Sequence, residues 1–280
     1  MAHRSYRIAD AHTHIYPDKI ARKAADSIGD FYGYPAQEEG TVSRLLQSSL
    51  PLGFEKYLVC SVAVSPARVG TINDFIVQCC REHPDRFIGF GTIHPAMPEK
   101  EMLQEALRIR EMGLAGIKLH PDIQQFCTDA PHMYPLYRLA RELGLRVLFH
   151  CGDDRYDYSG PVRTARVLED FPELTVLGGH LGGYQQWEEA RGLLTEYPNF
   201  YVDTSSTLSF LEPDAAREIL LSYSPDRVLF GTDFPLWHIG PQLDAFFALK
   251  LPEKLLPGIL YDNFARLFHR ELEKMPPLSL

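Results

Sequence analysis

The stretch Ile8-Ala9-Asp10-Ala11-His12-Thr13-His14-Ile15-Tyr16-Pro17 lies near the start of the chain and predicts a short β-strand that stops before its proline. Because side chains alternate between the two faces of a strand, His12 and His14 point to the same side, where their imidazoles can hold one metal ion. The alternative is a pair of half-buried histidines where a strand meets a loop. This stretch alone does not separate the two interpretations.

Seven more apolar runs follow along the chain. Most are continuously apolar rather than alternating, as expected of parallel strands that are covered on both faces. Amphipathic helical patterns separate them, and one such helix is predicted to begin after Thr41, whose side chain is suited to capping it. The eight predicted strands are 7–14, 56–63, 87–93, 115–120, 146–150, 175–179, 200–204 and 227–231.

Eight strands that alternate with helices in a chain of 280 residues predict an α/β fold of the (β/α)8 TIM barrel type, a single domain over residues 1–280. An open, doubly wound sheet is the alternative, but residues 178–183 lack the glycine spacing of its phosphate-binding turn. Loop insertions are predicted at residues 16–40, 121–131 and 152–161. Each follows the C-terminal end of a strand, where barrels build their active sites.

Composition limits the expected partners. The formal net charge of −9 disfavours binding to nucleic acid or to an anionic membrane. Residues 1–6 contain no apolar signal region and no run approaches the ~20 apolar residues of a membrane span, so a cytoplasmic location is expected. Five cysteines without Cys-x-x-Cys spacing argue against a disulfide framework and a thiolate zinc site. A small-molecule substrate and further copies of the chain are the expected partners.

Polar side chains gather where the predicted strands end. The C-terminal ends of barrel strands converge on one pocket, and histidines with a carboxylate make a site suited to zinc, with iron, manganese and nickel as poorer choices. One divalent ion, zinc, is therefore the expected cofactor. Asp203, inside the seventh strand, is expected to hydrogen-bond to His180 or another pocket group. The residues at the strand ends are His12, His14, His94, Lys118, His120, His150, His180 and Asp233.

Five motifs occur in order: Asp-Ala-His-Thr-His at 10–14, Gly-Ile-Lys-Leu-His-Pro at 116–121, Leu-Phe-His-Cys-Gly at 148–152, Gly-Gly-His-Leu-Gly-Gly at 178–183 and Gly-Thr-Asp-Phe-Pro at 231–235. Together they resemble the amidohydrolase superfamily, in particular the amidohydrolase-related branch that includes aminocarboxymuconate semialdehyde decarboxylase and various hydrolases. The resemblance implies a metal-dependent barrel enzyme with His12, His14, His150 and Asp233 as metal ligands. It also implies that Asp233 is the general base and that His180 binds a second metal or polarises the substrate.

Lys118 has two interpretations. In binuclear relatives a lysine at the fourth strand is carboxylated and bridges two metals, whereas a cationic lysine would hold a substrate carboxylate or balance charge. Alternation places Lys118 and His120 on one face, so both would enter the barrel. We favour a mononuclear site with Lys118 near the substrate, because nothing in the sequence indicates carboxylation. Arg155, in the third predicted insertion, is a further candidate for substrate binding.

The predicted function is a metal-dependent hydrolase that uses a metal-activated water to cleave an amide, lactone or related bond of a small organic substrate. The alternative is a non-oxidative decarboxylase of a small carboxylic acid, in which Lys118 or Arg155 clamps the carboxylate. Hydrolysis is favoured because Lys118 is more typical of the hydrolase-like members. Deoxyribonuclease-like barrels fit less well, since they have a glutamate in place of Lys118. A barrel that binds metal without catalysis is the non-enzymatic alternative.

Overall fold

A computed structural model describes residues 6–278 of the chain, and its eight strands are all parallel and follow one another around one sheet in sequence order. The predicted TIM barrel is therefore confirmed. Part of the stretch predicted to be free of a signal region, residues 1–5, lies outside the described residues. The strands are β1 Ile8–His14, β2 Phe54–Cys60, β3 Phe87–Thr92, β4 Gly116–Leu119, β5 Arg146–Phe149, β6 Val176–Gly178, β7 Phe200–Asp203 and β8 Val228–Leu229.

Backbone hydrogen bonds between β1 and the segment after β8 bring the two ends of the sheet together. The buried carboxylate of Asp10 adds to this contact, because it accepts hydrogen bonds from the backbone N–H and the hydroxyl of Thr232 at 3.0 and 2.6 Å. The first sequence motif thus ties the first strand to the last. The backbone bonds run from Ala11 N to Phe230 O, from Asp233 N to His12 O and from His14 N to Phe234 O, at 2.9, 3.0 and 2.7 Å.

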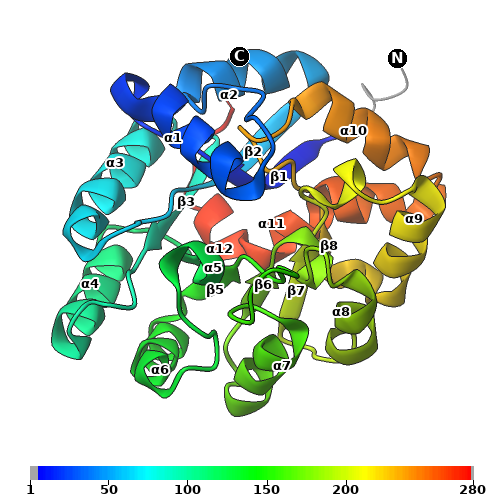
Figure 1. Ribbon diagram of the computed structural model, residues 1–280. Helices are drawn as coiled ribbons and strands as arrows, with labels where there is room; N and C mark the ends of the chain where they lie inside the picture. The colour runs from blue at the N-terminus through cyan, green and yellow to red at the C-terminus, as the bar shows by residue number, and fades with distance from the viewer. Residues whose placement is uncertain (1–5, 279–280) are drawn as a thin grey trace.

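Helices surround the sheet, as Figure 1 shows. Thr41 caps α2 as predicted, since its hydroxyl accepts a hydrogen bond from Arg44 N at 3.1 Å. The helices are α1 Asp18–Tyr32, α2 Val42–Ser49, α3 Val69–Glu82, α4 Glu99–Glu111, α5 Pro121–Gln124, α6 Tyr134–Leu143, α7 Pro161–Asp170, α8 Trp187–Leu194, α9 Pro213–Ser222, α10 Ile239–Ala248, α11 Asn263–Leu267 and α12 His269–Leu272.

Two of the predicted loop insertions contain helices. Helix α1 occupies much of residues 16–40, and α5 lies within residues 121–131. The buried positions of α1 are the small residues Ala21, Ala25 and Gly29, spaced four apart. A stripe of small residues lets a helix pack closely but gives none of the large apolar periodicity from which helices are predicted.

The N-terminal end of the barrel is closed by the end of the chain. Phe264 and Phe268 from α11 and its C-terminal boundary pack into a core cluster with inward-facing strand residues such as Leu58, Phe90 and Leu148. Helices α11 and α12 accordingly appear inside the ring of outer helices in Figure 1. Access to the barrel is left at the opposite, C-terminal end of the strands. Within residues 6–278, no helix is both long and apolar enough to cross a lipid bilayer.

Candidate active site

A pocket of about 400 Å³, part of it open to solvent, lies at the C-terminal ends of the strands. Helix α1 supplies part of its wall through Ala25, Ile28 and Tyr32. The structure thus brings seven of the predicted site residues to one pocket. They are His12, His14, Lys118, His120, His150, His180 and Asp233.

Three of these residues form a compact group of metal-binding atoms. His12 Nε2 and His14 Nε2 lie 3.7 and 3.6 Å from Asp233 Oδ1, and all three side chains are buried. The pairing of β1 with β2 is irregular between Asp10 and Thr13, a stretch that contains His12, and both His12 and His14 line the pocket. Two imidazoles and a carboxylate are a donor set suited to zinc or manganese, so these residues fit the predicted ion.

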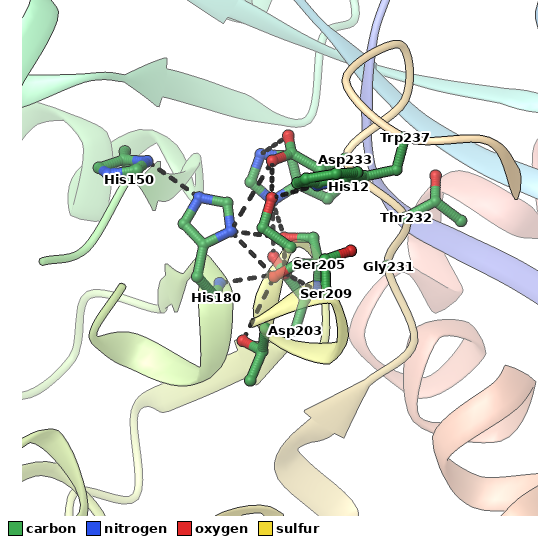
Figure 2. Close-up of polar contacts among 12 residues, drawn as sticks. His12, His150, His180, Asp203, Ser205, Ser209, Gly231, Thr232, Asp233 and Trp237 are labelled. Carbon is green, nitrogen blue, oxygen red and sulfur yellow. Dashed lines mark hydrogen bonds and ion pairs between the residues drawn. The ribbon is translucent and has the colours of Figure 1, made fainter. Parts of the chain in front are cut away.

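The buried carboxylate of Asp203 determines which nitrogen His12 offers. Asp203 Oδ2 lies 2.9 Å from His12 Nδ1, and Oδ1 accepts hydrogen bonds from the backbone N–H groups of Ser205 and His180 at 3.0 and 3.3 Å. Figure 2 shows Asp203, Ser205 and His180 around His12. Burial alone would raise the pKa of Asp203, but His12 lowers it below its usual range. The anion therefore holds a proton on Nδ1 and leaves the Nε2 lone pair facing Asp233.

His150 and His180 face each other, with His180 Nε2 2.9 Å from His150 Nδ1. The other ring nitrogens, His150 Nε2 and His180 Nδ1, lie 2.9 Å from the carbonyl oxygen of Gly152 and 3.0 Å from that of Ser205. A carbonyl oxygen only accepts hydrogen bonds, so both of these nitrogens carry the N–H group. The two nitrogens that face each other, His180 Nε2 and His150 Nδ1, then both present lone pairs, which requires a proton or a metal ion near them. His150 lines the same pocket, but its ring nitrogens are directed to His180 and Gly152, and it is not part of the close group formed by His12, His14 and Asp233.

Lys118 projects from β4 into the same pocket and is fully buried. Its ammonium nitrogen lies 3.0 Å from His12 Nε2, and no carboxylate of residues 6–278 forms an ion pair with it. Burial, and then the charge of Lys118, hold the pKa of His14 well below its usual range. His14 is consequently neutral near pH 7, the form in which imidazole binds a metal.

A relay of hydrogen bonds orients Asp233. Trp237 Nε1 donates to Ser206 Oγ at 2.8 Å, and Ser206 Oγ in turn donates to Asp233 Oδ2 at 2.5 Å. Burial alone would raise the pKa of Asp233, but His12, His180 and His14 lower it below its usual range. The carboxyl group is thus held as an anion with Oδ1 toward the histidines.

The backbone around the pocket is strained at three of these positions. His180, Ser206 and Asp233 have φ angles of 61, 56 and 61°. Non-glycine residues avoid this left-handed region, and such strain persists only where the surrounding structure fixes it, often at functional sites. The hydrogen bonds of Asp203 and Ser206 supply that constraint here.

Tyr32, at the end of α1, is a pocket residue that the sequence did not reveal. Its hydroxyl oxygen lies 2.7 Å from His120 Nε2 and 3.1 Å from His150 Nε2. Burial, followed by the charge of Asp122, raises the pKa of Tyr32 well above its usual range, so the phenol keeps its proton. A tyrosine in a segment predicted to be a loop carries no pattern that singles it out.

Other polar residues differ from their predicted places or were missed. Arg155 does not line the pocket and forms an ion pair with buried Asp153 at 2.7 Å. His94 accepts a hydrogen bond from the backbone of Ala96 at 3.2 Å and does not line the pocket either. Ser206 was not predicted, although a small polar residue just past the end of a strand is a signal that a search for ligands alone overlooks.

Taken together, the barrel and its pocket of histidines and a carboxylate define a metal-dependent α/β barrel enzyme. A family model described as Amidohydrolase matches residues 9–270, and the chain belongs to this family. The superfamily resemblance of its five motifs is thereby confirmed.

Among similar proteins are two decarboxylases. A 2-amino-3-carboxymuconate-6-semialdehyde decarboxylase from Dictyostelium discoideum is 35% identical over an alignment of 199 residues, and the match covers 59% of this chain and 55% of that protein. The chain thus matches little more than half the length of that relative. A gamma-resorcylate decarboxylase from Rhizobium sp. (strain MTP-10005) is 22% identical over an alignment of 245 residues, and the match covers 70% of this chain and 74% of that protein.

A solved structure shares the fold. A dihydroxybenzoic acid decarboxylase from Polaromonas sp. JS666, with bound manganese and the inhibitor 2-nitroresorcinol, superposes with a TM-score of 0.73 at 16% identity, over 94% of this chain and 97% of that chain. The relatives correct the prediction of hydrolysis, which is wrong, and favour its alternative, decarboxylation. The physical reason is that the same histidines and carboxylate serve both reactions, so the ligand pattern alone does not distinguish them.

Proposed function

We propose that the chain is a metal-dependent, non-oxidative decarboxylase of a small carboxylic acid. The observation that carries this proposal is the fully buried ammonium of Lys118, which lies 3.0 Å from His12 Nε2 and forms no ion pair with a carboxylate of residues 6–278. A buried charge without a counter-ion is costly, so the pocket favours an anionic ligand. A substrate carboxylate supplies that charge, and the decarboxylases found among the relatives support this choice.

We assign one divalent ion, zinc or manganese, to His12, His14 and Asp233, with His150 as the candidate fourth ligand. Bound there, the ion supplies positive charge that polarises oxygen atoms of the substrate. The bound manganese of the Polaromonas enzyme supports manganese as a candidate beside zinc. His12 is suited to this role because Asp203 keeps its Nδ1 protonated, which leaves the lone pair on Nε2, the nitrogen that faces Asp233 and Lys118.

Residues of the chain bind the substrate, exclude water and supply the proton. Lys118 binds and orients the carboxylate, and the apolar wall formed by Ala25, Ile28 and Leu236 excludes water from the reacting carbon. As carbon dioxide leaves, the electron pair of the broken C–C bond stays on that carbon, which then takes up a proton. Lys118 Nζ holds a proton in the pocket and is our candidate donor. His180 is a weaker candidate, because burial lowers its pKa to about 4 and leaves it neutral.

The test is carbon dioxide release from a panel of small unsaturated and aromatic acids by protein loaded with zinc or manganese. We expect equal amounts of carbon dioxide and decarboxylated product, and loss of both after chelation. Lys118→Met should lower turnover at least about 100-fold while metal content stays the same. The matched control is Lys100→Met, which changes an exposed lysine at the start of α4. Metal-loaded protein that releases no carbon dioxide from any of these acids contradicts the proposal.

A further inference from the structure

A directional chain of hydrogen bonds ends at Tyr32. His120 Nδ1 accepts a hydrogen bond from the backbone N–H of Ile123 at 3.3 Å, so the N–H of the neutral ring is at Nε2. His120 Nε2 lies 2.7 Å from the Tyr32 hydroxyl oxygen and donates to it. The oxygen of Tyr32 is therefore an acceptor in this contact, and its own proton is left for another partner.

The neighbouring His150 is a poor hydrogen-bond acceptor for the Tyr32 hydroxyl. Its Nε2, 3.1 Å from the hydroxyl, already donates to the carbonyl of Gly152 at 2.9 Å. Its Nδ1 carries a lone pair and is 3.3 Å from the hydroxyl, but it faces His180 Nε2 at 2.9 Å, and the proton or metal ion between these two nitrogens occupies that lone pair. The Tyr32 hydroxyl is thus a hydrogen-bond donor available to a ligand in the pocket that also contains Lys118.

Tyr32 lines two adjoining spaces, which also share His150, His180, Asp233 and Leu236. One is the polar pocket with Lys118, and the other is a smaller space of about 210 Å³, partly open to solvent. Aromatic rings of Tyr34, Tyr184 and Phe210 line the smaller space, and the Tyr184 ring lies 5.4 Å from that of Tyr32 and 5.3 Å from that of Phe210. Aromatic side chains of this kind make stacked or edge-to-face contacts with a flat apolar ring.

Contacts outside the pocket hold the end of α1, and therefore Tyr32, over the barrel. The guanidinium of Arg155 donates to the carbonyl of Phe31 at 2.6 Å and lies 5.2 Å from the centre of the Tyr32 ring. Arg155 is itself fixed by buried Asp153. The helix end is thus anchored to the segment that follows β5.

We propose that Tyr32 is the specificity-determining residue of the pocket and selects planar acids. Its hydroxyl donates a hydrogen bond to the carboxylate that Lys118 also binds. The flat ring of the acid lies against the aromatic side chains of Tyr34, Tyr184 and Phe210. This inference rests on the proposed function for the choice of a carboxylate as the ligand. It adds the shape of the acid and the residue that recognises it.

The test is calorimetric binding of benzoate and of the non-planar cyclohexanecarboxylate to metal-loaded protein. The native chain should bind benzoate more tightly than cyclohexanecarboxylate. Tyr32→Phe keeps the ring and removes the hydroxyl, so benzoate should bind at least about ten-fold more weakly. The matched control is Tyr197→Phe, which removes a phenol hydroxyl bonded to exposed Glu169 on the outer surface and should bind benzoate as the native chain does.

Unfolding temperature and metal content measured on each variant show that Tyr32→Phe is folded and loaded. Unchanged benzoate affinity in Tyr32→Phe, or a native chain that does not prefer benzoate, overturns the inference. A native chain that binds benzoate through Tyr32 but releases no carbon dioxide from any acid refutes the proposed function and leaves this inference standing. Carbon dioxide release with the same KM in Tyr32→Phe and the native chain refutes the inference alone.

Discussion

Asp203 Oδ2 lies 2.9 Å from His12 Nδ1, and both side chains are only 1% exposed. A carboxylate so close to an imidazole keeps the proton on the near nitrogen, increases the basicity of the far nitrogen and fixes the plane of the ring. The far nitrogen, Nε2, is the one that faces Asp233. Asp203 therefore prepares His12 for a cation without binding the cation itself, since its own oxygens are already occupied by hydrogen bonds.

Asp203→Asn should weaken metal binding about 10- to 100-fold, because an amide no longer holds the proton on His12 Nδ1. Competition with a chromophoric chelator measures the affinity. Asp214→Asn is the matched control, since the side chain of Asp214 is 91% exposed, lies on helix α9 and does not line the pocket. An affinity equal to that of the native chain would exclude Asp203 from this role.

His14→Ala should reduce the metal content of purified protein from about one ion per chain to a small fraction, because it removes one of three clustered ligands. Elemental analysis of protein purified with and without added manganese gives the stoichiometry. His132→Ala, at an exposed position before α6, should leave the content unchanged. Full occupancy in His14→Ala would show that the ion binds elsewhere.

Ser206→Ala should lower kcat about ten-fold or more, with a smaller effect on metal content. The substitution removes the hydroxyl that donates to Asp233 Oδ2 and leaves the buried carboxylate free to rotate. Trp237→Phe should have a weaker effect in the same direction, because it removes only the donor that orients Ser206. Exposed Ser43→Ala serves as the control. If kcat is the same in Ser206→Ala and in the control, the relay does not position Asp233.

The barrel was predictable because its strands are buried on both faces and so appear as continuous apolar runs, and because histidines such as His12 and His150 stand at strand ends. Tyr32 was not predictable, since α1 packs through small residues that give no apolar periodicity. The role of Asp203 toward His12 depends on a contact across the barrel between residues 191 positions apart. The reaction itself was predicted wrongly, because the ligand set is common to hydrolysis and decarboxylation.

Asp122 should make the stability of the protein depend on pH. Its side chain is buried, Ser159 donates to its Oδ2 at 2.6 Å, and its Oδ1 has no hydrogen-bond partner among the described residues. Burial raises the pKa of Asp122 to about 7, against about 3.9 in the unfolded chain. The folded state binds this proton more tightly, so the contribution is complete below about pH 4 and is lost as the pH rises through about 7.

Asp122→Asn removes this titration. The unfolding free energy of the native chain should fall more steeply between pH 5 and 7 than that of the variant, by at most about 1.4 kcal/mol per pH unit. Urea unfolding at several pH values measures the difference, and Asp214→Asn should follow the native curve. Parallel curves for Asp122→Asn and the native chain would show that Asp122 is ionised throughout.

Phe268→Ala should destabilise the fold without altering the pocket. The Phe268 side chain is fully buried at the closed end of the barrel, packs against Phe264 and Phe90 with ring centroids 4.7 and 6.0 Å apart, and lies under the guanidinium of Arg146. Its truncation leaves a cavity that should lower the free energy of unfolding by about 3–5 kcal/mol.

The control is Leu193→Ala, at a 42% exposed position, which should lower the free energy of unfolding by about 0.5 kcal/mol or less. Urea unfolding measures both losses, and metal content should stay unchanged, because the site lies at the opposite end of the strands. A loss below about 1 kcal/mol in Phe268→Ala would mean that α11 and α12 do not seal the barrel.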